Sequence, residues 1–163
     1  MKAARIREYN KRLVLEDVPI PDVRPDEVLV QVRACGMCRS DVQLVDGYFR
    51  KYNDIPTPII PGHEITGLVH TLGGLVPQSS GLQEGDHVVV APGCDVPLFP
   101  RVSREQTFHG SFWGNYTDLS EVMVLAAQGK IRHTVKTITF DQINEYIERL
   151  RTGEIVGRAV IKF

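Results

Sequence analysis

The chain has 163 residues, 42% of them hydrophobic, and a formal net charge of −1. This length supports one adequate hydrophobic core but not two full domains, and the near-neutral charge offers no basic stripe for nucleic acid and no polybasic arm for an anionic membrane. No apolar run approaches membrane-spanning length and no signal-peptide pattern opens the chain, so we expect a cytoplasmic protein whose three cysteines are thiols or ligands before they are disulfides.

The first 92 residues are rich in short β-type runs. Residues 27–32 alternate in the strand period, and residues 65–71 and 86–91 are short runs bounded by Gly and Pro, which together predict a strand-rich barrel. One short helix is predicted from near Cys38 to Gly47, because Gly is a natural helix stop. Cys38 would then lie at a helix N-terminus, where the dipole and the free amides favour the thiolate.

The C-terminal part has a helical pattern. Asp118 and Glu121 resemble a reciprocal cap on a helix that ends at Gly129, and Asp141 is expected to open a second helix closed by Gly153. Residues 158–163 predict a final strand. The predicted fold class is therefore α+β, mainly β, with a junction of low order at residues 92–106, which hold three of the ten prolines.

Two short motifs contain the chemistry. Cys38-Arg-Ser-Asp41 and Pro61-Gly-His63-Glu64 place a thiolate, an imidazole and two carboxylates where they suit one zinc ion. A catalytic zinc keeps at least one position for water or substrate. Asp41 and Glu64 are therefore interpreted as carboxylates that hydrogen-bond to the metal ligands or that exchange onto the metal.

Each motif also has a plainer interpretation. Cys38 could be a buried structural thiol, or half of a redox C-x-x-C pair with Cys35, but a redox pair usually lies in a βαβ pattern that is not found here. Cys35 itself is interpreted as packing. A lone His63 could be a satisfied core histidine, and its Gly-His-Glu context favours a ligand instead. The remaining histidines are interpreted as surface or strand positions.

Six motifs occur in the order typical of one family, and they cover residues 1–92 and about 107–163: Met1–Arg5, Cys35–Asp41, Pro61–Gly67, Gly85–Val89, Phe140–Asn144 and Gly157–Val160. With these motifs the chain resembles the zinc-dependent medium-chain alcohol dehydrogenases. The resemblance implies a single GroES-like catalytic domain assembled from residues 1–92 and 107–163, with a junction at about 93–106. It also implies a parent reaction that converts an alcohol to an aldehyde or ketone with NAD(P).

The resemblance assigns roles to matching residues. It implies that Cys38, His63 and Glu64 are metal ligands, with Glu64 able to exchange on and off the zinc, and that Asp41 accepts a hydrogen bond from the zinc-bound His63. A carboxylate on the far nitrogen of a ligand imidazole fixes its tautomer and raises its basicity. Ser40 resembles the hydroxyl that passes a proton to or from the substrate oxygen, although an ordinary helix-start Ser is an equal alternative.

Three departures from the family bear on activity. No G-x-G-x-x-G is present, so we interpret the dinucleotide-binding (Rossmann) domain as excised, by engineering rather than naturally. Arg39 and Arg158 resemble the arginines that bind the cofactor pyrophosphate. Without that domain we expect both to be vestigial, solvated surface charges. The third protein ligand of the family is missing, and Cys94 or Asp95 could replace it. A proton-relay His found in many relatives is Gln43, which cannot carry a proton at neutral pH.

Two functions remain open from the sequence. The chain is either the zinc-binding, substrate-side domain of an alcohol dehydrogenase without turnover of its own, or a minimal metal scaffold, with zinc-promoted hydrolysis as a weaker idea. The partner classes expected are a small alcohol or carbonyl compound and a second copy of the chain. A homodimer would form through Thr107–Trp113, an apolar run that resembles a sheet-edge strand of the family.

Overall fold

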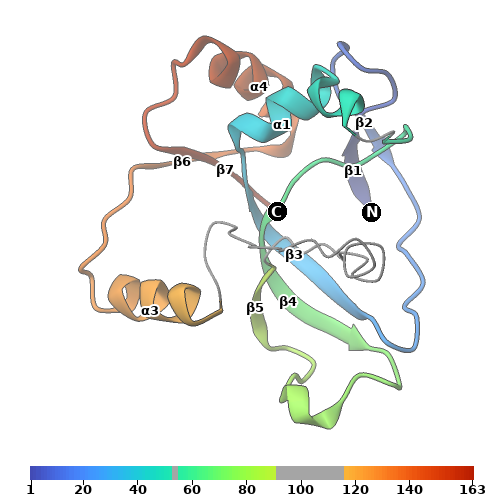
Figure 1. Ribbon diagram of the computed structural model, residues 1–163, viewed down its shortest axis with the longest axis vertical. Coiled ribbons are helices and arrows are strands. Elements are labelled where there is room, and N and C mark those ends of the chain that lie inside the picture. Colours follow the sequence, from blue (N-terminus) through green and yellow to red (C-terminus); the bar gives the residue numbers. More distant parts are fainter. Residues whose placement is uncertain (53–54, 91–115) are drawn as a thin grey trace, which may run out of the picture. The chain divides into compact units, whose positions relative to one another are not determined.

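The computed structural model describes residues 1–52, 55–90 and 116–163 (Figure 1). The chain divides into two compact units, Met1–Pro92 with Thr134–Phe163, and Gly93–His133. In the second unit the described element is helix α3, Tyr116–Ala127. None of the described helices has the length and apolar character needed to cross a membrane.

The first unit is built on a five-stranded sheet of order β5-β4-β3-β7-β6. Its strands are β3 (Val28–Gly36), β4 (Glu64–Leu72), β5 (His87–Val90), β6 (Val135–Ile138) and β7 (Arg158–Lys162). β3, β4, β5 and β7 pair antiparallel, whereas β6 pairs parallel with β7. A separate hairpin joins β1 (Lys2–Arg5) and β2 (Val14–Asp17).

Two helices cover one end of this sheet (Figure 1). α1 (Arg39–Val45) follows β3, and α4 (Ile143–Thr152) precedes β7. Their apolar faces bury Val42 and Val45 from α1 and Ile143, Tyr146 and Ile147 from α4. These side chains form the core together with Ala4, Ile6, Leu13, Met37, Ile138, Ala159 and Ile161.

Hydrogen bonds also join both ends of α1 to the C-terminal end of α4. A guanidinium nitrogen of Arg39, at the start of α1, donates to the carbonyls of Leu150 and Arg151 at 3.0 and 3.1 Å. In return Arg151 binds the carboxylate of Asp46, the residue that ends α1, at 2.5 Å. The Arg39 side chain of α1 thus supplements the C-cap of α4, where the N–H of Gly153 also donates to the Leu150 carbonyl at 3.3 Å.

The fold class predicted from the sequence is confirmed: the first unit is mostly sheet, with a short helix after Cys38 and α4 near the C-terminus. Details of two helix starts were wrong. α3 begins at Tyr116, so Asp118 lies in its first turn and is not its cap. α4 is preceded by a 3-10 turn, Phe140–Gln142, in which Thr139 and Gln142 form the capping box instead of Asp141.

Several predictions fall outside the described residues. They are the junction at 93–106, the substitute ligands Cys94 and Asp95, and the dimerisation strand Thr107–Trp113. The assembly of one domain from residues 1–92 and 107–163 also remains a prediction. Among the other histidines, His70 and His87 lie exposed on strands and His133 is exposed, as predicted.

Candidate metal centre

The register of β3 and β4 brings the two sequence motifs together. Gly36, the last residue of β3, pairs with Glu64, the first residue of β4. Cys38, the N-cap of α1, follows Gly36 by two positions, and His63 lies immediately before Glu64. Residues that are 25 positions apart in the sequence therefore meet at one end of the sheet.

Cys38 is fixed by the start of α1. It is the N-cap residue, with extended backbone angles of φ −113° and ψ 159°. The backbone N–H of Cys38 donates to Oδ2 of Asp41 at 2.8 Å, so the carboxylate reaches back over the first turn. This bond satisfies an N-terminal amide and holds the thiol at the mouth of the turn.

Asp41 connects the helix to His63. Its second oxygen, Oδ1, faces Nδ1 of His63 at 3.4 Å, while Oδ2 holds Cys38. Asp41 is the one buried charged side chain among the described residues, and burial raises the pKa of its carboxyl above the usual value, partly offset by the Cys38 amide and by His63. A carboxylate in this place favours a proton on Nδ1, which leaves Nε2 as the nitrogen for a metal.

Three donor atoms converge beside this pair. One sulfur, nitrogen or oxygen atom each from Cys38, His63 and Glu64 lies within 4.8 Å of the other two, and all three residues are half-buried. A point about 2.8 Å or less from all three atoms therefore exists, against zinc–ligand distances of about 2.0–2.3 Å. The donor set and this spacing fit zinc after a small closure of the side chains.

Ser40 lies next to the same imidazole. Its hydroxyl is 3.2 Å from Nε2 of His63, the nitrogen that a metal would take. The hydroxyl therefore lies beside one of the three donor residues of the candidate metal centre. The geometry thus brings together Cys38, His63, Glu64, Asp41 and Ser40, which are the residues that the sequence singled out.

The two arginines are exposed, and each also has a bonding partner within the chain. Arg158 donates to the carbonyl of Met37 at 3.1 Å and lies 3.4 Å from Oε1 of Glu64, while Arg39 is bonded to the end of α4. Both side chains are partly exposed but neither is a freely solvated charge. The pairing of Arg158 with Glu64 was missed, because the two residues are 94 positions apart and no local pattern links them.

A glycine missed by the sequence analysis makes room for Glu64. A Cβ added at Gly36 would overlap Oε2 of Glu64, so the carboxylate occupies the space that a side chain at residue 36 would fill. The signal was present in Cys35-Gly-Met-Cys38, where a small residue precedes the ligand Cys by two positions. Its reason becomes visible only through the pairing of Gly36 with Glu64.

Comparison with known proteins agrees with this geometry. Residues 24–135 match the model of the alcohol dehydrogenase GroES-like domain. The chain belongs to this family. It is 41% identical over 106 residues to an alcohol dehydrogenase of Rhizobium meliloti, and 43% identical over 98 residues to alcohol dehydrogenase B of Mycobacterium tuberculosis. These matches cover 60% and 57% of the chain but 28% and 24% of the relatives, so the chain spans about a quarter of their length.

Solved structures show the same fold. The alcohol dehydrogenase of Aeropyrum pernix aligns over 100% of both chains with a TM-score of 0.79 at 18% identity, which supports the fold alone. A protein described as a zinc-binding dehydrogenase from Sinorhizobium meliloti, determined with NADP bound, aligns with a TM-score of 0.52 at 29% identity. That alignment covers 63% of this chain and 28% of the other. The GroES-like domain of the alcohol dehydrogenase family is thereby confirmed.

Proposed function

We propose that the chain is the zinc-binding, substrate-side domain of an alcohol dehydrogenase, with Cys38, His63 and Glu64 holding one zinc ion. The observation that carries the proposal is the convergence of one thiol, one imidazole and one carboxylate within 4.8 Å. A thiolate, a neutral imidazole and a carboxylate are all ordinary zinc ligands, and three protein ligands leave a position open for substrate. The parent reaction is the oxidation of a small alcohol to an aldehyde or ketone.

The residues around the proposed zinc ion have separate roles. When bound, the zinc would polarise the oxygen of the alcohol or carbonyl substrate. Asp41 holds the His63 ring by its Nδ1 edge, so the imidazole keeps one tautomer and one orientation. The Ser40 hydroxyl, 3.2 Å from Nε2 of His63, is placed to pass a proton to or from that oxygen. Gln43 cannot continue this relay, because its amide does not titrate at neutral pH.

We further propose that the chain has no dehydrogenase turnover by itself. A dinucleotide pyrophosphate needs a Gly-rich turn and a helix N-terminus, and the sequence contains no G-x-G-x-x-G. Arg39 and Arg158 cannot supply that cradle, since both already donate to backbone carbonyls. We interpret the nucleotide-binding domain of the family as excised between residues 92 and 107, with the metal motifs kept.

Metal content tests the site. Purified protein should contain about one zinc per chain by elemental analysis, and Cys38→Ala and His63→Ala should each contain little, because a site with three ligands does not survive the loss of one. His87→Ala is the control, because His87 is an exposed strand residue away from the cluster. Undiminished zinc in both ligand variants would overturn the assignment.

Cofactor binding tests the second proposal. Titration with NAD or NADP should show no saturable binding at concentrations that saturate a complete alcohol dehydrogenase. No alcohol oxidation should be measured above background. Steady turnover of a simple alcohol that scales with this protein and disappears in Cys38→Ala would refute the proposal.

A further inference from the structure

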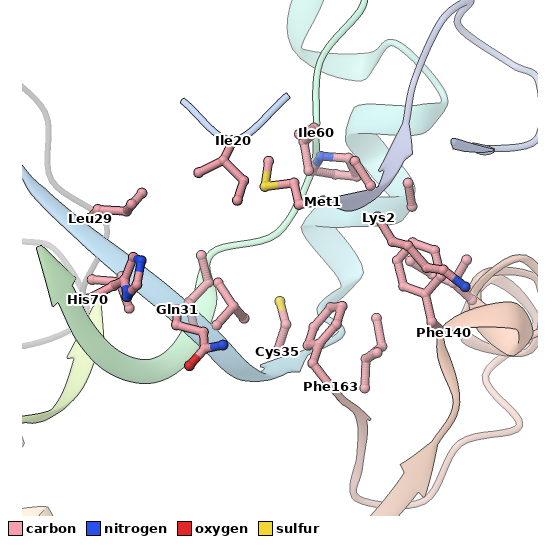
Figure 2. Close-up of a pocket in the computed structure, with 18 residues that line it drawn as sticks. Met1, Lys2, Ile20, Leu29, Gln31, Cys35, Ile60, His70, Phe140 and Phe163 are labelled. Carbon is pink, nitrogen blue, oxygen red and sulfur yellow. The ribbon is translucent and has the colours of Figure 1, made fainter. Parts of the chain in front are cut away.

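A second candidate site lies beside the β3–β4 pair. A partly open cavity of about 400 Å³ is bounded by β1, β3, β4 and β7 (Figure 2). Its apolar walls include Ala4, Leu29, Val32, Ile65, Ile143 and Ile161. Cys35 and Ile65 line this cavity, whereas their neighbours Gly36 and Glu64 do not. None of the three proposed metal ligands lines the cavity.

The charged groups that line the cavity are positive. Among the described residues that line the cavity, none is Asp or Glu, and the positive charges are the side chain of Lys2 and the α-ammonium of Met1, which donates to the Val18 carbonyl at 2.6 Å. Within the described part of the chain Lys2 makes no ion pair, although Asp17 is its cross-strand neighbour in the hairpin. Figure 2 shows Lys2 and His70 at opposite sides of the lining, with the thiol of Cys35 between them.

We propose that this cavity binds a small amphiphile with an unbranched aliphatic chain and an anionic head, the chain lying among the apolar walls and the head at Lys2. A volume of about 400 Å³ falls within the usual 300–1,000 Å³ of ligand pockets, which are mostly apolar with a few polar groups. Removal of the aliphatic chain from water would provide most of the affinity, and a carboxylate matches the positive charge of Lys2. The site is independent of the metal and of the proposed dehydrogenase role.

Calorimetric titration with decanoate, below the concentration at which it forms micelles, tests the proposal. We expect saturable binding at about one site per chain, and octanoate should bind about fifteenfold more weakly because it has two fewer methylenes. Lys2→Gln should weaken decanoate binding about threefold to fivefold, with recovery in Lys2→Arg. Lys136→Gln is the matched control, since Lys136 is an exposed strand lysine outside the lining.

Cys35 provides a reporter inside the cavity. In a Cys38→Ser, Cys94→Ser variant, which keeps Cys35 as the single thiol, decanoate should slow maleimide labelling of Cys35 in proportion to occupancy. Burial raises the pKa of this thiol to about 11, so labelling is best compared at alkaline pH. Absence of saturable decanoate binding, or binding that leaves Cys35 labelling unchanged, would overturn the proposal. Equal affinity for decanoate and decanol in wild type and Lys2→Gln would overturn the assignment of the head group.

Discussion

Two cysteines three positions apart have opposite surroundings. Cys38 caps a helix at the polar end of the sheet, where His63, Glu64 and Asp41 gather around it. Cys35 belongs to β3 and lines an apolar cavity, where burial raises the pKa of its thiol to about 11. The same side chain is a candidate ligand in one place and an inert packing group in the other. The difference comes from backbone position: Cys35 lies within β3 and contributes to the lining of the cavity, and the turn into α1 places Cys38 beside His63 and Glu64.

Among the changes around the candidate metal centre considered next, Asp41→Asn is expected to have the largest effect on zinc affinity. The amide can still accept from the Cys38 backbone, but it no longer favours a proton on Nδ1 of His63. Zinc affinity should fall by about ten to a hundredfold, as is typical when a carboxylate behind a ligand histidine is lost. Competition with a zinc-binding dye would measure it. Asp46→Asn, in an exposed pair at the other end of α1, should leave the affinity unchanged.

Gly36→Ala tests the space reserved for Glu64. The new Cβ would overlap the carboxylate, and the flexible side chain would move away at little cost to the fold. We expect zinc binding to weaken severalfold while the free energy of unfolding changes by about 1 kcal/mol or less. Gly74→Ala is the control, because a Cβ at Gly74 meets no atom within 4 Å. Unchanged zinc affinity in Gly36→Ala would exclude Glu64 as a ligand.

The pH dependence of Cys35 sharpens the contrast between the two thiols. Its pKa is raised from 9.0 to about 11, so the native state keeps the proton in a range where the unfolded chain loses it. Stability contributed by the neutral thiol is therefore present below pH 9 and is lost as the pH rises from about 9 to about 11. Urea unfolding of wild type and Cys35→Ala across this range should show a steeper decline in the wild type. Parallel curves would contradict a buried Cys35.

The smallest effect is expected from Arg158→Gln. This change removes the bond to the Met37 carbonyl and the 3.4 Å contact with Glu64. Because Arg158 is partly exposed, we expect a loss of about 0.5–1.5 kcal/mol in the free energy of unfolding, mostly from the hydrogen bond, and little from the ion pair. Zinc affinity should change by less than the Asp41→Asn effect. A loss of zinc as large as that of Asp41→Asn would show that Arg158 is needed to position Glu64.

The residues of the candidate site could be selected from the sequence, because each motif is local. The structure brings Cys38, His63, Glu64 and Asp41 together, and their role as a metal centre stays a prediction. Strands β1, β2 and β6 were not predicted, since the existence of such short strands depends on tertiary pairing, whereas β5, equally short, was marked by its run of valines. The start of α4 was misjudged because a 3-10 turn capped by Thr139 precedes the helix, whose own N-cap is Gln142.

Long-range contacts could not be predicted at all. The cavity requires side chains from four strands to face one another, and the bond from Arg39 to the end of α4 joins residues 111 positions apart. The local pattern around Arg39 resembles a cofactor arginine, whereas the structure places its guanidinium on the carbonyls of Leu150 and Arg151. Such assignments depend on the packing of α1 against α4, which no local motif specifies.

The most direct test of the metal centre is the absorption spectrum of the cobalt-substituted protein. Cobalt(II) can replace zinc at a site with thiolate, imidazole and carboxylate ligands, and a bound thiolate gives a sulfur-to-cobalt charge-transfer band. We predict that this band appears at one cobalt per chain, is lost in Cys38→Ser, and is kept in Cys35→Ser. A band that survives in Cys38→Ser and disappears in Cys35→Ser would contradict the separation of the two cysteines.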